Sequence, residues 1–103
     1  MVARGEVWWY EHPDSGRRPH VILARPEALG ILTRVIAAPV TRVVRGIPTE
    51  VALDRSDGMP HDSVVSLDNI GLVTKALLVE RITILGPERM NAVCEALRFA
   101  TAC

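Results

Sequence analysis

Residues 6–24 read EVWWYEHPDSGRRPHVILA, and this stretch decides the fold. Residues 6–10 and 20–24 are short segments rich in valine, isoleucine, leucine and aromatic side chains, a composition typical of β-strands. Between them, Pro13-Asp14-Ser15-Gly16 combines residue types that favour turns. The stretch therefore predicts two strands separated by a turn.

The alternation of short apolar segments and turn-forming segments continues along the chain. Further strands are predicted at residues 34–40, 49–53, 63–67 and 81–85, with turn-forming residues at 45–48, 57–60 and 68–71. Residues 72–78 fit no single pattern and are compatible with a short helical turn. Short strands at this spacing indicate a compact antiparallel barrel or sandwich.

The last segment changes from a strand period to a helix period. Met90, Val93, Cys94, Leu97 and Thr101 recur at helical spacing and share one face of a helix. The proline and the acidic residue at positions 87 and 88 are typical of a helix start. We expect an amphipathic C-terminal helix that closes the core, and hence a mainly β fold of the α+β class.

The composition, with 49% apolar and 23% charged residues, is that of an ordinary globular protein. A chain of 103 residues has room for one core, so residues 1–103 are expected to form a single domain. No apolar stretch approaches the ~20 residues that cross a bilayer, and the first residues lack the apolar segment of a signal peptide. We therefore expect a cytoplasmic protein that makes no membrane contact and has no disulfide between Cys94 and Cys103.

The formal charge is zero, but it is unevenly distributed along the chain. Residues 1–49 hold seven arginines against four acidic residues, and residues 50–103 hold five basic against eight acidic residues. Eleven of the twelve basic residues are arginine, whose planar guanidinium suits phosphate and base edges. Taken alone, this pattern also fits arginines that only keep the surface soluble.

Three of the four aromatic residues are adjacent: Trp8, Trp9 and Tyr10. Because side chains alternate along a strand, Trp9 is expected on the face opposite to Trp8 and Tyr10. One face is core, and the other is interpreted as a dimer interface, with stacking of nucleic-acid bases as the alternative.

Several kinds of chemistry find no support in the sequence. The three histidines and two cysteines show no metal-ligand spacing, and no glycine-rich phosphate loop occurs, so neither a metal nor a nucleotide cofactor is expected. A triad of Ser63, His61 and Asp62 is not expected, because neighbours on a strand point to opposite faces. His61 is interpreted as a solvated turn residue.

Two arginine- and threonine-containing segments remain. Proline is tolerated at a strand start or sheet edge, so Pro19 and Pro39 both indicate irregular edge positions. They place Arg18 near an exposed rim and Thr41 at the end of the third strand. Two edges of this kind predict a groove.

Five segments in this order resemble the MazF/PemK/Kid toxins of type II toxin–antitoxin systems over nearly the whole chain. They are Arg4-Gly5-Glu6-Val7-Trp8-Trp9, Gly16-Arg17-Arg18-Pro19-His20-Val21-Ile22-Leu23, Ala38-Pro39-Val40-Thr41, Asp62-Ser63-Val64-Val65 with Leu67-Asp68-Asn69-Ile70, and the final helix.

The resemblance implies an SH3-like small antiparallel β-barrel, a homodimer and an endoribonuclease that cleaves single-stranded RNA at short sequences. It implies no metal or other cofactor: the ribose 2′-OH attacks its own phosphodiester and leaves a 2′,3′-cyclic phosphate and a 5′-OH. Arg18 and Thr41 correspond to the catalytic pair, and both suit electrostatic stabilisation of a phosphorane. The general base stays open, with Asp68 a candidate for that role or for a base-edge contact.

Further expectations concern substrate and partners. Arg17, Arg42 and Asn69 are expected to contact RNA, Asn69 by reading a base edge. A cognate antitoxin of the MazE type is expected to occupy the groove and cover Arg18. The family usually has a longer loop where this chain has only residues 11–16, so cleavage-site preference is the least transferable property.

Two other functions compete with RNA cleavage. A toxin of the same fold that binds DNA gyrase would need aromatic and small C-terminal residues, whereas this chain ends in Ala100-Thr101-Ala102-Cys103. An SH3-like adaptor would need an aromatic-lined groove, which four aromatic residues, three of them consecutive, can hardly form.

Overall fold

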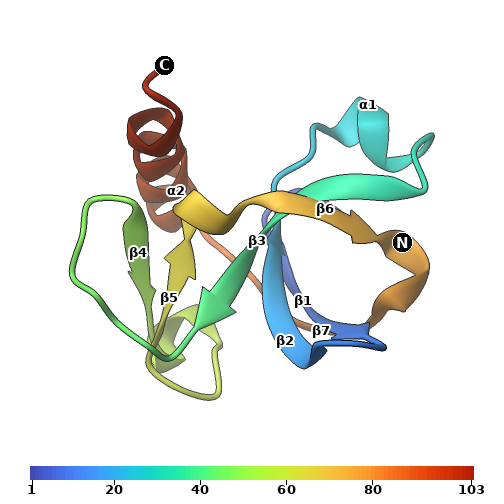
Figure 1. Ribbon diagram of the computed structural model, residues 1–103, viewed down its shortest axis with the longest axis horizontal. Coiled ribbons are helices and arrows are strands. Elements are labelled where there is room, and N and C mark those ends of the chain that lie inside the picture. The colour runs from blue at the N-terminus through green and yellow to red at the C-terminus, as the bar shows by residue number, and fades with distance from the viewer.

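The computed structural model describes all residues 1–103 and consists mainly of a curled antiparallel sheet with one C-terminal helix (Figure 1). The strands are β1 (Glu6–His12), β2 (Gly16–Ile22), β3 (Arg34–Thr41), β4 (Glu50–Leu53), β5 (Ser63–Ser66), β6 (Gly71–Thr74) and β7 (Leu78–Ile84). Their order in the sheet is β4-β5-β3-β2-β1-β7, and β6 pairs with β3. The predicted mainly β barrel with a terminal helix is confirmed.

Strand β3 connects the two halves of the molecule. Its first residues pair with β6, residues 37–39 pair with β2, and Val40 and Thr41 pair with β5. Figure 1 shows β3 crossing from the half that contains β1, β2 and β7 to the half that contains β4 and β5. The start of β2 and the end of β3 therefore diverge, which leaves room between them for a groove.

Strand β2 begins earlier than the sequence predicts. Residues 16–19 pair with β1, with Trp9 opposite Pro19 and Tyr10 opposite Arg18, but the β2–β3 ladder starts only at His20. The missing N–H of Pro19 therefore costs no bond to β3. Arg18 lies on this one-sided, exposed part of the strand, as the proline predicted.

Several other elements differ from the predictions. The short helical turn with which residues 72–78 are compatible is present as the 3₁₀ turn η3 (Lys75–Leu77), but the strand β6 that precedes it was not predicted. The one-turn helix α1 (Pro26–Leu29) was also not predicted, and neither were the 3₁₀ turns η1 (Arg55–Asp57) and η2 (Leu67–Asn69). Strand β7 begins at Leu78 rather than at residue 81.

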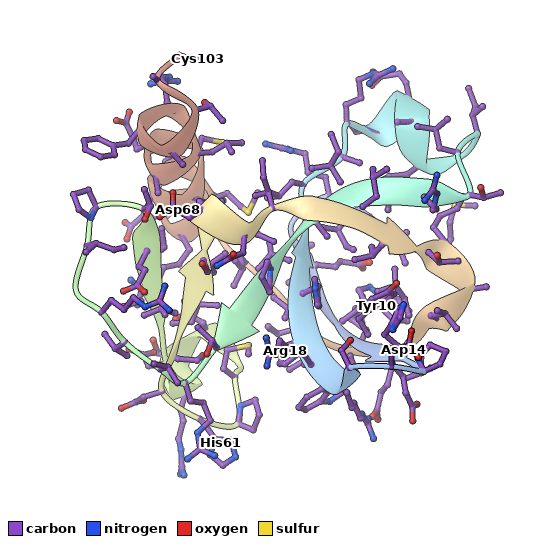
Figure 2. The ribbon with its side chains drawn as sticks, viewed as in Figure 1. Tyr10, Asp14, Arg18, His61, Asp68 and Cys103 are labelled. Atoms are coloured by element: carbon purple, nitrogen blue, oxygen red, sulfur yellow. The ribbon has the colours of Figure 1, made fainter.

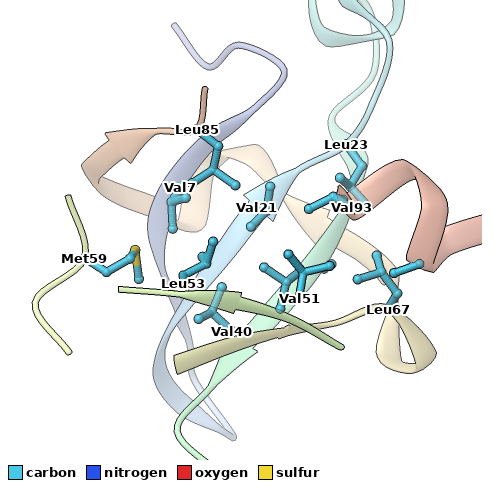
Figure 3. Packing of buried hydrophobic residues seen from close by; sticks show 13 residues of the cluster. Val7, Val21, Leu23, Val40, Val51, Leu53, Met59, Leu67, Leu85 and Val93 are labelled. Carbon is cyan, nitrogen blue, oxygen red and sulfur yellow. The ribbon is translucent and has the colours of Figure 1, made fainter. Parts of the chain in front are cut away.

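The C-terminal helix α2 (Pro87–Thr101) packs against β4 and η2. Val93 and Ala96 are buried in its core-facing side, and Met90 and Leu97 pack beside them. They belong to a cluster of 13 buried residues that fills the space between the sheet and the helix (Figure 3). Helix α2 therefore closes the core, as its periodicity predicted.

A second cluster of 8 buried residues lies around β3, β6 and α1, and Trp8 and Tyr10 pack against it. Trp9 does not belong to this cluster and lies instead beside the guanidinium of Arg17. The predicted alternation of the three aromatic residues is confirmed. Cys94 and Cys103 are both free thiols, and no helix is long and apolar enough to cross a membrane.

Candidate active site

Two adjoining hollows lie where β2 and β3 separate. The first, of about 400 Å³, is lined by residues from β1, β2, the end of β3 and the loop 54–62 between β4 and β5. The second, of about 360 Å³, is lined by β3, the chain that follows it, β5 and η2. Arg18, Thr41 and Val43 line both hollows. Arg18 and Thr41 therefore lie at the junction of one continuous groove.

Arg18 and Arg17 have different surroundings. Arg17 forms an ion pair with Glu80 at 3.0 Å and lies over the ring of Trp9 at 4.8 Å. Arg18 is exposed, and its guanidinium has no hydrogen-bond or ion-pair partner within the chain. An unpaired guanidinium in a groove retains all its donors for an anion such as phosphate.

Thr41 is held in place at the end of β3. It pairs with Val64 of β5, and its Oγ1 accepts a hydrogen bond from the backbone N–H of Val43 at 3.2 Å. The hydroxyl hydrogen is not used by this contact, so it can be donated to a ligand in the groove. Arg18 and Thr41 together offer donors from two strands to the same groove.

His20 supports the backbone of Arg18 from the same face of β2. Its Nδ1 lies 3.2 Å from the carbonyl oxygen of Arg18, and because a carbonyl only accepts, Nδ1 carries the hydrogen and donates it. Burial lowers the pKa of His20 and the positive charge of Arg18 lowers it further, although this hydrogen bond acts in the opposite direction. His20 is not predicted as a site residue from the sequence, although the alternation of side chains beyond Pro19 places it on the same face of β2 as Arg18.

The remaining candidates divide into two groups. Arg17 and Arg42 line the first hollow, and Asn69 lines the second, where its Nδ2 donates to Ser66 Oγ at 2.8 Å. Asp68 lines neither hollow: its Oδ2 accepts a 2.6 Å hydrogen bond from Thr49 Oγ1. Figure 2 places Asp68 beyond the end of β5 that faces α2, away from Arg18.

Three residues of the groove were missed or differently interpreted from the sequence. Arg45 and Glu50 line the second hollow, and Glu50 Oε1 accepts from the backbone N–H groups of Arg45 and Gly46 at 3.0 and 2.9 Å. His61 is exposed, as expected of a turn residue, but it lines the first hollow together with Arg18 and Thr41. Only the fold brings this loop to the groove.

Comparisons with known proteins agree with this architecture. The family of PemK-like, MazF-like toxins of type II toxin–antitoxin systems matches residues 3–101. A curated relative from Mycobacterium tuberculosis, named "Probable endoribonuclease MazF5", is 46% identical over 104 residues, covering 100% of this chain and 95% of the relative.

Two solved structures have the same fold. The Mycobacterium tuberculosis toxin MazF-mt6 is 33% identical, with 94% of this chain and 96% of that chain covered and a TM-score of 0.86. A mycobacterial endoribonuclease in complex with its cognate antitoxin is 28% identical, with 99% and 96% covered and a TM-score of 0.90. The chain belongs to the PemK-like, MazF-like toxins of type II toxin–antitoxin systems.

Proposed function

We propose that the chain is a single-domain endoribonuclease toxin that acts in the cytoplasm and cleaves single-stranded RNA at short sequences without a metal ion. The observation that carries this proposal is the position of Arg18 and Thr41 at the junction of the two hollows. A phosphate bound at the junction has one of the two hollows on either side of it. The related endoribonucleases of Mycobacterium tuberculosis support the same activity.

Arg18 and Thr41 act on the phosphodiester by electrostatic stabilisation. The 2′-OH on the 5′ side of the scissile bond attacks phosphorus, and negative charge grows on the non-bridging oxygens. The free guanidinium of Arg18 donates two hydrogen bonds to these oxygens, and the Thr41 hydroxyl donates a third. Collapse of the phosphorane yields a 2′,3′-cyclic phosphate and a 5′-OH.

The other groove residues bind the strand on either side of that phosphate. Arg17 and Trp9 form a stacked pair at one wall of the first hollow, which suits a flanking base. Arg42 contacts a neighbouring phosphate, and Asn69 reads a base edge in the second hollow. Asp68 lies outside both hollows with its Oδ2 bound to Thr49, so we assign it neither a base-edge contact nor the role of general base.

The proposed partners follow from the same groove. A second copy of the chain forms a homodimer, and an antitoxin of the MazE type inserts a flexible acidic or apolar segment over Arg18. The structure of a related endoribonuclease with its cognate antitoxin supports such a complex. Arginines of the first half of the chain provide the positive surface for an acidic segment.

The test is cleavage of a pool of single-stranded RNAs in EDTA, with sequencing of the fragment ends. We expect cyclic phosphate and 5′-OH ends with the wild-type protein, and a loss of about 10²-fold or more with Arg18→Ala or Thr41→Ala. Circular dichroism verifies that both variants fold. Intact RNA combined with inhibition of DNA gyrase would contradict the proposal and favour the gyrase-binding alternative.

A further inference from the structure

The first hollow contains one side chain that can take up a proton at neutral pH. Its charged residues are Arg17, Arg18 and Arg42, and a guanidinium that stays protonated is a poor general base. The exception is His61, whose imidazole can accept and donate a proton in the range where enzymes operate. His61 belongs to the loop 54–62 and lines this hollow together with Arg18 and Thr41.

The acidic residues around the groove are already engaged. Glu50, in the second hollow, accepts two backbone hydrogen bonds through one carboxylate oxygen. Asp68 accepts from Thr49 outside both hollows. Neither carboxylate shares the first hollow with Arg18 and Thr41, so His61 is left as the proton acceptor on that side of the junction.

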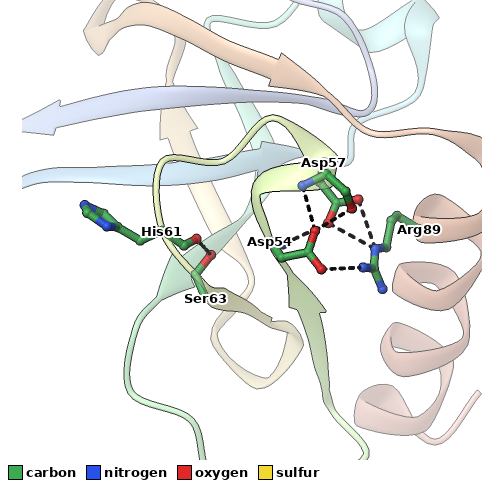
Figure 4. A network of polar contacts seen from close by, with 6 residues as sticks. Asp54, Asp57, His61, Ser63 and Arg89 are labelled. Carbon is green, nitrogen blue, oxygen red and sulfur yellow. Dashed lines mark hydrogen bonds and ion pairs between the residues drawn. The ribbon is translucent and has the colours of Figure 1, made fainter.

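The loop that carries His61 is anchored at several points (Figure 4). Arg89 of α2 donates from Nε to both carboxylate oxygens of Asp57 at 3.0 and 3.2 Å and lies 3.6 Å from Asp54. Thr83 of β7 donates to the backbone carbonyl of Asp57 at 2.8 Å. The loop is thus fixed to two elements before any ligand binds.

The anchoring continues up to His61 itself. Met59 is 4% exposed and belongs to the main core cluster. Ser63, at the start of β5, donates to the carbonyl oxygen of His61 at 3.3 Å. Figure 4 shows the imidazole extending away from the Asp54–Asp57–Arg89 cluster. A fixed backbone with a free imidazole is the arrangement that a general base needs.

We infer that His61 is the general base that activates the ribose 2′-OH, an assignment that rests on the proposed endoribonuclease function. An imidazole nitrogen removes the 2′-OH proton as the 2′ oxygen forms its bond to phosphorus. The bond between phosphorus and the 5′ oxygen then breaks, and the leaving oxygen takes a proton from water. The hydroxide so formed removes the proton from the imidazolium, which restores His61.

The pH dependence of the reaction depends on the charged residues that share the hollow with His61. Arg17 and Arg18 of β2 and Arg42 after β3 line the same hollow, and Asp62 is its neighbour in the loop. All three arginines stay charged across the working range, so they add no step of their own. A general base acts only in its deprotonated form, so the proposal predicts that the rate falls tenfold per pH unit on the acidic side.

The experiment begins with the wild-type protein, the RNA pool and EDTA, which identify a cleavage site. A short RNA around this site is then used for rates, and the same RNA with a 2′-deoxy nucleotide at the scissile position is used for binding. We expect His61→Ala and His61→Gln to lower the single-turnover rate by about 10²-fold or more, with binding of the deoxy analogue within about twofold of wild type. The acidic decline of the rate disappears in both variants.

Imidazole in the buffer separates a missing base from a disturbed site. It is expected to raise the rate of His61→Ala but not that of Arg18→Ala. Arg55→Gln, in the same loop and outside both hollows, is the matched control and keeps the wild-type rate.

The two proposals fail in different ways. Wild-type cleavage together with an unchanged rate and acidic decline in His61→Ala would contradict the role of His61 alone. If His61→Ala no longer bound the deoxy analogue and imidazole did not restore its rate, the role of His61 as general base would also be contradicted. Intact RNA with the wild-type protein would contradict the endoribonuclease function itself.

Discussion

Arg17 and Arg18 are neighbours in the chain, yet only one of them is free. The guanidinium of Arg17 is held by Glu80 and Trp9, whereas that of Arg18 has no partner and lies at the junction of the groove. Both residues lie on the part of β2 that pairs only with β1, and because side chains alternate along a strand, Arg17 lies on the face of Trp9 and Arg18 on the opposite face. In the proposed mechanism these two neighbours therefore have separate tasks, RNA binding for Arg17 and charge stabilisation for Arg18.

Arg18→Lys tests whether geometry or charge matters at the junction. Lysine keeps the positive charge but loses the planar pair of donors. We expect the single-turnover rate to fall by about 10²-fold, with a much smaller change in binding of the deoxy analogue, because the lost hydrogen bond forms mainly in the transition state. A rate within a few-fold of wild type would contradict bidentate stabilisation by Arg18.

Glu6 provides a prediction about stability at the residue scale. Burial raises the pKa of Glu6, but hydrogen bonds from Trp8, the backbone of Ala3 and Arg81 outweigh it, and the net pKa lies below the usual value. Because the pKa of Glu6 is lower in the folded state, its charged carboxylate stabilises the fold. This stabilisation is complete above the ordinary glutamate pKa of about 4.3 and is lost as the pH falls through the pKa of Glu6 in the folded protein.

We expect Glu6→Gln to lower the free energy of unfolding at pH 7 by about 1–3 kcal/mol. The difference from wild type should shrink below about pH 4. Urea unfolding of the wild type and of Glu6→Gln between pH 3 and pH 7 measures this difference in the free energy of unfolding. Glu95→Gln, on the exposed face of α2, is the control. A difference that stays constant down to pH 3 would be inconsistent with a charged Glu6.

At the scale of elements, the apolar segments and the helical period predict most strands and helix α2. The sequence predicts that β2 begins at residue 20, whereas the strand begins at Gly16. Residues 16–19 have a low strand propensity because they are polar or proline and glycine, and they pair only with β1. Strand β6 escaped detection because it is four residues long and exposes Leu72 while burying Val73. Pairing with β3 defines this strand, and single-sequence patterns contain no information on pairing partners.

The candidate site was predictable in part. Arg18 and Thr41 came from the resemblance and from the two prolines, and the fold brings them to one groove. The placement of Asp68 outside the groove and of His61 inside it depends on the two ends of β5. His61 precedes the strand and Asp68 follows it, so no local pattern indicates which of them faces Arg18.

The loop 54–62 allows a test at the element scale. Gly58 has a φ of +92°, and a Cβ atom there would clash with Thr83 Oγ1, the atom that donates a hydrogen bond to the carbonyl oxygen of Asp57. We expect Gly58→Ala to destabilise the protein by about 1–3 kcal/mol. The displaced loop should also lower the cleavage rate, since it carries His61.

Gly30→Ala is the matched control for this substitution. Gly30 has a φ of −85°, and a Cβ atom there would meet no atom within 4 Å. The melting temperature of this variant, measured by circular dichroism, should equal that of the wild type or lie slightly above it, because alanine restricts the unfolded chain. Equal melting temperatures for the two variants would exclude the proposed strain at Gly58.

At the scale of the whole molecule, a chain of zero net charge gathers positive charge at one place. The four arginines that line the groove all come from the first 49 residues: Arg17, Arg18, Arg42 and Arg45. The divergence of β2 and β3 brings their two segments together. The net charge of the whole chain gives no sign of this positive surface, whereas the excess of arginine over acidic residues in residues 1–49 does.

This charge distribution predicts the salt dependence of RNA binding. Each phosphate neutralised on a single strand contributes about 0.7 to the slope of log affinity against log salt. Arg42→Gln and Arg45→Gln are each expected to reduce the slope by about 0.7. Arg98→Gln, at an ion pair with Glu95 on α2, should leave it unchanged. Equal slopes in all three variants would contradict an RNA path along the groove.

The central claim, that Arg18 and Thr41 form an RNA-cleaving site driven by the 2′-OH, has one direct measurement. A short RNA containing the mapped cleavage site and its copy with a single 2′-deoxy nucleotide at the scissile position are incubated with the protein in EDTA. We predict that the RNA is cut and that the deoxy copy binds with similar affinity but stays intact, while Arg18→Ala cuts neither. Cleavage of the deoxy copy, or cleavage of the RNA by Arg18→Ala at the wild-type rate, would contradict the account.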